Sequence, residues 1–230
     1  YSWNQFSQLT SITNPNQHST SIVRDGNGNI TQISNHLGHQ TQLEYNSQGL
    51  VTVITQPNGL ISNYSYNAQG LLETLTETPP STSPGSVRIT SYSYNSNGLL
   101  SQLTTPDQII INYQYDELNR VIQISDQLGQ SLNYSYDQHG NRITSQTTNV
   151  DSTLALRVSQ AYDTRNRLVT ITSPHTTTED SIYQLTLDRN SNLQALLDPR
   201  QNSRQISYDP ENRITTQTHQ LGGISHYEYD

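Results

Sequence analysis

Apolar residues recur along the chain in short groups, and residues with strong turn preferences separate these groups. Tyrosine occurs repeatedly in pairs that are two positions apart. Both members of such a pair face the same side of a β-strand, because successive side chains alternate between the two faces. The pattern therefore predicts many short strands with a tyrosine-bearing face. Stacking of successive units would line these tyrosines into a ladder of cross-strand aromatic pairs. The pairs are Tyr64/Tyr66, Tyr92/Tyr94, Tyr113/Tyr115, Tyr134/Tyr136 and Tyr227/Tyr229.

Aliphatic residues in the segments between these pairs are spaced by three positions instead of two. In a regular strand this spacing crosses from one face to the other, and taken alone it is closer to a helical pattern. The turn signals lie too close together to leave room for a helix. A β-bulge, or burial of both faces, would reconcile the spacing with a strand, and both explanations stay open. The pairs are Ile30/Ile33, Val51/Ile54, Leu72/Leu75, Leu100/Leu103, Val121/Ile124, Leu168/Ile171 and Leu193/Leu196.

The pattern repeats with a period of 21 residues. Its anchor positions lie near residues 3, 24, 45, 66, 94, 115, 136, 162, 187, 208 and 229, and seven of the ten spacings are 21. The three longer spacings are explained by loop insertions near residues 77–88, 146–156 and 174–182, which lengthen one loop without disturbing the rest of the repeat. We therefore predict a single array of repeats over residues 1–230.

Each repeat contains two turn signals. The first follows the anchor, where an Asp or Asn precedes a Gly or Asn by three positions, as in Asp137 and Gly140. The second lies about twelve to fourteen residues after the anchor, as in the segment 57–59, Pro-Asn-Gly. Two turns in 21 residues leave room for two strands of about six residues. The sequence thus predicts an all-β fold of tandem β-hairpins.

Composition and charge narrow the classes of function. Hydrophobic residues make up only 30% of the chain and charged residues 13%, so a thin sheet is easier to build than a thick core. The net charge is −8 and all basic residues are arginine, which argues against nucleic-acid binding. The absence of cysteine excludes disulfides, and no apolar run is long enough to span a bilayer. Because the chain lacks an initial methionine, we expect an excerpt or a processed product.

The turn motifs resemble the YD repeat of the RHS family. Residues 136–142 read Tyr-Asp-Gln-His-Gly-Asn-Arg and match one form of that repeat without substitution. Residues 115–121 and 208–214 match the other form, with Asn119 and Asn212 in place of glycine. The early repeats are degenerate, since Asn mostly replaces Asp and the arginine is missing. The resemblance covers essentially the whole chain.

Membership of this family implies a strip of hairpins wound into a solenoid-like or shell-like sheet. In bacterial RHS proteins and toxin-complex subunits such a shell encloses a toxin, and a similar barrel belongs to teneurins, which are adhesion receptors of the cell surface. Toxin-type shells usually end in a self-cleaving segment with an Asp-Pro-x-Gly motif. Asp198-Pro199 departs from that motif because Arg200-Gln201 follows it.

We predict that the patterned turn residues form a structural repeat motif. Aspartate would cap the turn, and arginine would bridge to an acid or a carbonyl of the neighbouring repeat. The motif residues are Tyr45, Gly49, Tyr66, Gly70, Tyr94, Gly98, Tyr115, Asp116, Arg120, Tyr136, Asp137, Gly140, Arg142, Tyr162, Asp163, Arg167, Tyr208, Asp209, Arg213, Tyr229 and Asp230.

No catalytic, cofactor or metal site is predicted. The segment 25–29 begins like a calcium loop, but Ile30 stands where glycine is required and His36 stands at the position of the last ligand. His36 and His39 flank a turn and lack further ligands near them in the sequence. Acidic pairs such as Glu179-Asp180 do not recur with a nucleophile. We therefore expect no enzyme and no bound cofactor.

Two hypotheses of function follow. The first is a non-catalytic shell or scaffold segment of an RHS/YD-repeat protein that encapsulates or carries a toxin or other cargo. The alternative is an extracellular structural or adhesive protein whose repeats assemble into a tube or filament. Both place the chain outside the cell or on its surface. The expected partners are neighbouring repeats of the same or a longer chain, a protein cargo, or further copies, without nucleic acid or a membrane span.

Overall fold

The computed structural model describes residues 1–82, 85–151, 153–174, 180–219 and 222–230. These residues form strands and turns and contain no helix, which confirms the predicted all-β fold. The chain divides into two compact units, Tyr1–Ile111 and Asn112–Asp230, and each is described by itself below. The assignment of residues 1–230 to a single array stays a prediction.

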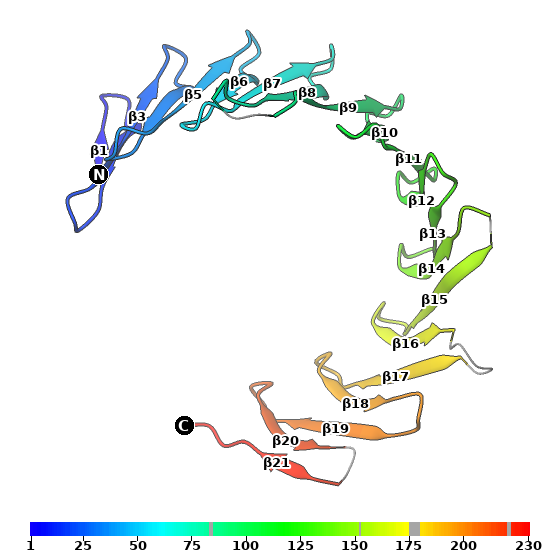
Figure 1. Ribbon diagram of the computed structural model, residues 1–230. Coiled ribbons are helices and arrows are strands. Elements are labelled where there is room, and N and C mark those ends of the chain that lie inside the picture. The colour runs from blue at the N-terminus through cyan, green and yellow to red at the C-terminus, as the bar shows by residue number, and fades with distance from the viewer. Residues whose placement is uncertain (83–84, 152, 175–179, 220–221) are drawn as a thin grey trace. The chain divides into compact units, whose positions relative to one another are not determined.

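The first unit is a run of antiparallel hairpins in which each strand pairs with the next strand along the chain (Figure 1). A strand that ends in the next unit, β11 (Ile110–Tyr115), begins here. The other strands are β1 (Ser2–Trp3), β2 (Leu9–Thr13), β3 (Ser19–Arg24), β4 (Ile30–Ser34), β5 (Gln40–Tyr45), β6 (Val51–Thr55), β7 (Ile61–Tyr66), β8 (Leu72–Thr78), β9 (Arg88–Tyr94) and β10 (Leu100–Thr104).

The second unit repeats this arrangement with longer strands in its middle. Each described pairing again joins consecutive antiparallel strands. The strands are β12 (Val121–Asp126), β13 (Ser131–Tyr136), β14 (Arg142–Thr148), β15 (Leu154–Tyr162), β16 (Leu168–Ser173), β17 (Ser181–Leu187), β18 (Leu193–Leu197), β19 (Ser203–Tyr208), β20 (Ile214–Thr218) and β21 (Ile224–His226).

The connections between β8 and β9, between β14 and β15, and between β16 and β17 lie within the three ranges given for the insertions. Residues 146–148 and 154–156 of the second range belong to β14 and β15, and the assignment of these ranges to insertions stays a prediction. These connections occupy the second-turn position of their repeats. In the first of them, Pro80 lies over the neighbouring turn, because a Cβ added at Gly59 would stand 2.8 Å from Cβ of Pro80. Residues 83–84, 152 and 175–179 of the predicted insertions, including Glu179, lie outside the described residues.

A β-bulge explains the three-residue spacing of the aliphatic residues. In the β7–β8 hairpin, Tyr66 pairs with Leu72 and Tyr64 pairs with Leu75, and the register shifts between these two pairs. One residue of β8, Glu73, is left over by the shift. The extra residue brings Leu72 and Leu75 onto the face that carries both tyrosines. The same shift follows the first turn of the described repeats, so the bulge is the correct one of the two explanations.

The same registers correct one expectation about the tyrosines. Pairs spaced by two suggest a ladder in which tyrosines of successive repeats lie directly opposite one another. Each repeat instead contributes two strands, so the strand between two tyrosine strands carries aliphatic residues. Tyr94 pairs with Leu100 and Tyr92 with Leu103. The direct cross-strand contacts of these tyrosines are therefore aromatic–aliphatic.

The sheet has a tyrosine face and a polar face. Along β5, Leu43 and Tyr45 are partly buried, whereas Gln42 and Glu44 on the other face are exposed. Among the described residues only Ile206 and Ser62 are buried, at 7% and 5% exposure. The chain exposes 15544 Å², whereas a compact monomer of its mass is expected to expose about 10,500 Å². The hairpins of each unit thus form a single layer, and the described residues of that unit provide no second layer to cover it.

Candidate functional site: the junction between successive repeats

The residue after each anchor acts as a cap for the first turn, and Asp137 shows how. Its backbone N–H donates to the carbonyl of Asn141, and the N–H of Gly140 donates to its carbonyl. Its Oδ1 accepts the N–H groups of His139 and Asn141, at 2.9 Å each. One side chain thus satisfies two backbone donors of a type I turn that is followed by a left-handed residue. The local order of residues dictates this geometry.

The same hydrogen bonds recur in most of the described turns, including second turns. Asn35 caps a second turn by accepting the N–H groups of Leu37 and His39. Asparagine and aspartate serve equally here, because both present an Oδ1 acceptor. First-turn caps are Asn4, Asp25, Asn46, Asn67, Asn95, Asp116, Asp137, Asp163, Asp188 and Asp209.

The third residue after the cap has a positive φ. Gly49, Gly70, Gly98 and Gly140 occupy this position with φ between 77° and 88°. Asparagine tolerates the left-handed region better than most side chains, which accounts for Asn119, Asn166 and Asn212 at the equivalent place, with φ of 60° to 63°. The substitution of Asn for Gly in the YD motif therefore leaves the turn type unchanged.

Most anchor tyrosines donate a hydrogen bond to the repeat before their own. The hydroxyl of Tyr66 donates to the carbonyl of Val51 at 2.7 Å, and Val51 is the residue paired with the previous anchor, Tyr45. This carbonyl lies at the bulge, where the regular ladder is interrupted. The hydroxyl group thus supplies a donor to a carbonyl beside the bulge. The equivalent bonds run from Tyr45 to Ile30, Tyr94 to Leu72, Tyr136 to Val121, Tyr162 to Arg142 and Tyr208 to Leu193.

Burial favours the protonated form of the Tyr66 hydroxyl. It raises the pKa of Tyr66 above its ordinary value of 10.0, and the neighbouring Tyr64 acts in the same direction. The pKa values of Tyr94 and Tyr115 are raised by the same two causes. A neutral phenol can donate to a carbonyl and a phenolate cannot, so the junction retains its donor over the whole neutral range.

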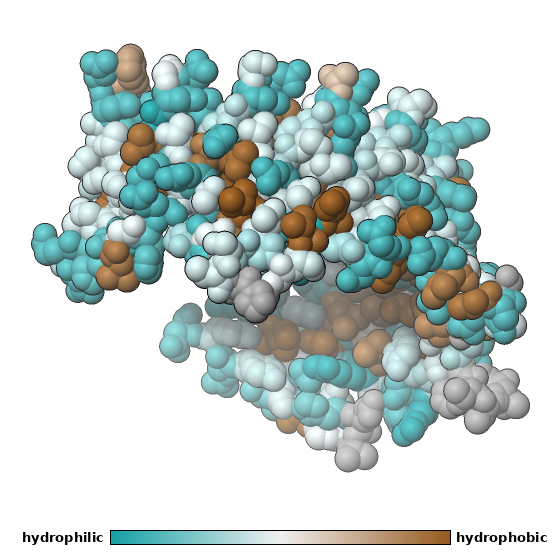
Figure 2. Space-filling model, turned by 45° about the horizontal axis from the view of Figure 1, so that its top comes forward, coloured by the Kyte–Doolittle hydropathy of each residue, from teal (hydrophilic) through white to brown (hydrophobic). Residues whose placement is uncertain are grey.

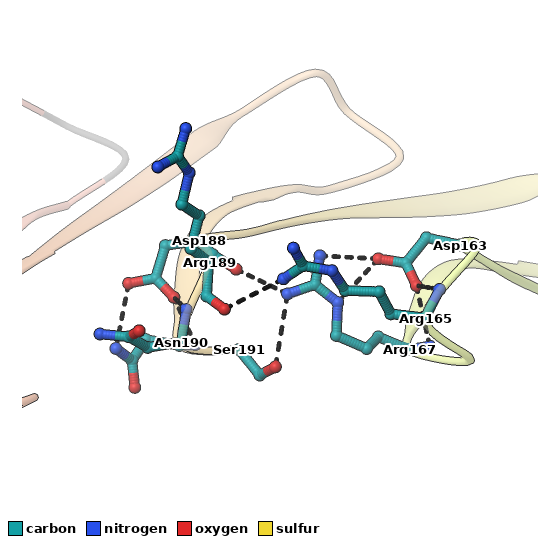
Figure 3. A network of polar contacts seen from close by, with 8 residues as sticks. Asp163, Arg165, Arg167, Asp188, Arg189, Asn190 and Ser191 are labelled. Atoms are coloured by element: carbon teal, nitrogen blue, oxygen red, sulfur yellow. Dashed lines mark hydrogen bonds and ion pairs between the residues drawn. The ribbon is translucent and has the colours of Figure 1, made fainter.

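The residue four positions after the cap bridges to the next repeat, and we call it the bridging residue. In Figure 3, Arg167 lies between two turns. Its Nε donates to Oδ2 of Asp163 at 2.7 Å, and its Nη1 donates to the carbonyl of Asp188 at 2.6 Å. Arg120 makes the same pair of contacts, with Asp116 and with the carbonyl of Asp137. The predicted bridge from arginine to a neighbouring carbonyl is present in these two repeats.

Other residue types at the bridging position reach the same place. A Cβ added at Gly70 would lie 3.6 Å from Cδ1 of Leu50, and one added at Gly98 would lie 3.7 Å from Cδ1 of Leu71. Asparagine bridges by its amide, as Nδ2 of Asn192 donates to Oδ1 of Asn212 at 2.8 Å. Sequence reasoning missed Leu50, Leu71 and Asn192 because it followed the arginine and not the position. Their constant distance of four residues from the cap is the signal that finds them.

Arg142 does not occupy the bridging position of its repeat. It lies five residues after its cap, pairs with Tyr136 across the hairpin, and places its guanidinium 5.1 Å from the ring centroid of Tyr134. Among the described residues its side chain has no acidic or carbonyl partner, in contrast to the prediction for it. The bridging position of this repeat belongs to Asn141, whose amide donates to Asn166. One extra residue before the arginine accounts for the difference.

The last predicted motif residues are Arg213, Tyr229 and Asp230, and Arg213 occupies the same position in its repeat as Arg120. Arg213 forms an ion pair with Asp209 at 2.7 Å, and its guanidinium lies 4.6 Å from the ring centroid of Tyr229. Arg120 lies over Tyr136 in the same way, also at 4.6 Å. A guanidinium over an aromatic ring gains cation–π attraction. Asp230 ends the chain beyond the last described strand.

Hydrogen bonds lower the pKa values of the capping carboxylates. For Asp163 and Asp137 the largest contribution comes from the side chains of Arg167 and Asn141, and for Asp116 from the backbone N–H of Arg120. Each bond favours the charged form, because a carboxylate accepts more strongly than a carboxylic acid. The caps therefore stay ionised below the ordinary aspartate value of 3.8.

The described residues contain no group of three or more acidic, histidine or cysteine residues arranged to hold a metal ion. The carboxylate of Asp25 accepts hydrogen bonds from Asn27 and Asn29, as the carboxylate of an ordinary cap does. His36 stacks on His18 with ring centroids 3.8 Å apart. In the part of the chain that is described, no helix is long and apolar enough to cross a membrane.

Open grooves lie between successive first turns. One runs beside Glu73 and Tyr94, and an equivalent one runs beside Gln194 and Tyr208. Both lie next to the extra residue of the bulge, so they follow from the stacking of repeats. The arrangement can join hairpins through side chains, and nothing in these two grooves sets one repeat apart as a reaction site.

Comparison with known proteins gives one family and a set of similar structures. A family model described as Teneurin YD-shell matches residues 1–173. No curated protein matches the chain. The crystal structure of TcdB2-TccC3 without its hypervariable C-terminal region is 18% identical, with a TM-score of 0.64, over 93% of this chain and 12% of that chain. The Tc holotoxin pore of Photorhabdus luminescens, carrying TccC3-D651A, is 14% identical, with a TM-score of 0.60, over 95% of this chain and 14% of that chain.

Proposed function

The chain belongs to the teneurin YD-shell family, and from this we propose that it forms part of the wall of a β-shell that encloses or carries a protein cargo such as a toxin. The observation that supports this most directly is the single-layer sheet, with 15544 Å² exposed and two buried residues among those described. A one-layer sheet separates two spaces but buries little by itself. A wall needs that property and a compact enzyme core does not.

We propose that the motif residues serve this wall as structural joints without a catalytic role. Caps close the turns, anchor tyrosines donate to the previous repeat, and bridging residues reach the next one. In the part of the chain that the structure describes, each joint contacts neighbouring repeats, as in other repeat proteins. A continuous array over residues 1–230 would carry these joints from end to end.

The similar Tc structures support the fold, and one of them is a holotoxin pore. The chain spans only 12% to 14% of those proteins. A toxin-like cargo and a secreted or cell-surface location are therefore part of the proposal. The rival function is an extracellular structural or adhesive protein whose arrays stack into a tube or filament.

Electron microscopy of the full-length protein that contains this chain tests the proposal. We expect closed, hollow particles, together with a segment that resists added protease until the shell is denatured. Filaments or open tubes, with every segment outside the sheet digested at once, would replace the shell by the adhesive alternative. Hydrolase activity that disappears on mutation of a single carboxylate would refute the non-catalytic role.

A further inference from the structure

Exposed aliphatic residues gather at the second-turn edge of the second unit. Leu128, Val150 and Leu154 are 64%, 55% and 54% exposed. Figure 2 shows that hydrophobic residues form separate groups on a surface that is otherwise largely hydrophilic. Large exposed aliphatic side chains that lie together mark interaction sites more often than isolated ones do.

Backbone pairing brings these residues together. Leu128 lies in the turn between β12 and β13, and Val150 lies in the connection between β14 and β15. The carbonyl oxygen of Val150 stands 3.5 Å from the position of a Cβ at Gly129, so the two loops touch. Thr148 pairs with Leu154, which places that leucine at the same edge. We call Leu128, Val150 and Leu154 the aliphatic rim.

The charges at the rim differ from those at the opposite edge. Asp126 and Asp151 accept hydrogen bonds from their own turns and have no ion-pair partner among the described residues. Arg157 is the nearby base, so the rim keeps an excess of negative charge. At the first-turn edge, by contrast, arginines neutralise Asp116 and Asp163 at 2.7 Å.

We propose that the aliphatic rim is a docking surface for a basic segment of a partner protein that also carries apolar side chains. The apolar side chains of the partner would cover Leu128, Val150 and Leu154, and its lysine or arginine residues would approach Asp126 and Asp151. Complementary charge selects such a partner and rejects a like-charged one. A second copy of this chain is a poor occupant, because it carries a net charge of −8 and no lysine.

Fluorescence anisotropy with two labelled synthetic peptides tests the inference on the intact chain. One peptide alternates leucine with lysine, and the other alternates leucine with glutamate. We expect the leucine–lysine peptide to bind at least about tenfold more tightly than its acidic counterpart. Leu154→Ser combined with Val150→Ser should weaken its binding by about tenfold, and Asp126→Asn should weaken it by a smaller factor.

Leu118→Ser is the matched control, since Leu118 is 69% exposed in a first turn at the opposite edge. The leucine–lysine peptide should bind the Leu118→Ser variant as tightly as it binds the parent chain. Asp126→Asn guards against misfolding, because Asn35 caps an equivalent turn with the same two hydrogen bonds. Equal loss in the Leu118→Ser variant, or equal binding of the acidic peptide, overturns the inference. Self-association in sedimentation velocity that Val150→Ser abolishes would also overturn it, by making a second copy the occupant.

Discussion

A single hydroxyl group links most anchor tyrosines to the repeat before them. The acceptor is a carbonyl at the bulge, so sheet irregularity and tyrosine position are parts of one arrangement. Tyr66 and Tyr64 share a face, but only Tyr66 makes this bond among the described residues. The two tyrosines of a pair thus have different roles, which their sequence spacing does not reveal.

Removing the hydroxyl of Tyr66 should destabilise the first unit. We expect Tyr66→Phe to lower the free energy of unfolding by about 1 kcal/mol, because a partly buried carbonyl loses its donor. Urea unfolding monitored by circular dichroism measures the change. Tyr64→Phe is the control, and we expect a smaller effect there. An equal effect of the two substitutions would show that the bond to Val51 contributes nothing particular.

Glycine at the turn position matters where φ is positive. Gly70 has φ of 79° with Cδ1 of Leu50 3.6 Å from the position of a Cβ, so Gly70→Ala should destabilise the chain by roughly 1–2 kcal/mol. Gly26 has no positive φ and no atom within 4 Å of that position, so Gly26→Ala should be nearly neutral. Thermal unfolding of both variants compares them, and a Gly70→Ala variant as stable as the parent would exclude strain at this position.

At the scale of the hairpin, the two units form the same first turn with different residue types at the cap and at the bridging position. First-turn caps of the first unit are mostly asparagine, whereas all five in the second unit are aspartate. The bridging residues also differ between the units. They include the apolar Leu50 and Leu71 in the first unit and the charged Arg120 and Arg167 in the second. Apolar contact and a charge-assisted hydrogen bond are thus interchangeable between repeats, provided that the position is kept.

This difference predicts that acid destabilises the second unit first. The pKa values of Asp116, Asp137 and Asp163 are lower in the folded state than the ordinary value of 3.8. Their contribution to stability is therefore complete above pH 3.8 and disappears as the pH falls through the lower folded values. Asn46 and Asn67 do not titrate, so the first unit should keep its turns longer.

Hydrogen exchange at a series of acidic pH values tests this order. We expect the amides of β13 to β19 to lose protection at a higher pH than those of β5 to β8. Substituting Asp116, Asp163 and Asp209 by asparagine together should flatten the pH dependence of the second unit. Loss of protection in both units at the same pH would contradict an origin in the capping carboxylates.

At the scale of the whole molecule, strands contact the strands next to them along the chain. Stability then behaves as a sum of repeats and nearest-neighbour junctions. A sheet of this kind has no central core whose loss would unfold the chain at once. The proposed wall function suits such a construction, because repeats can be added without redesigning the others.

We therefore expect a destabilising substitution to weaken only the strands near it. Gly70→Ala should accelerate hydrogen exchange in β7 and β8, and leave exchange in β16 to β19 of the second unit unchanged. Mass spectrometry of the exchanged peptides resolves these segments. Asn166→Val is the corresponding variant of the second unit, because it forces a β-branched residue to φ near 60°. It should accelerate hydrogen exchange in the second unit and leave exchange in β7 and β8 unchanged. A uniform increase along the chain in either variant would indicate one cooperative unit instead.

The sequence alone determined the period, the two turns of each repeat and the all-β fold, because these depend on residues within a few positions of one another. Asp137 and Gly140 specify their turn whatever surrounds them. The choice between a bulge and two buried faces, and the contact of each bridging residue with the next repeat, depend on strand register. Register aligns residues of different hairpins, about 20 positions apart in the chain, through backbone pairing. Only the tertiary structure could decide them.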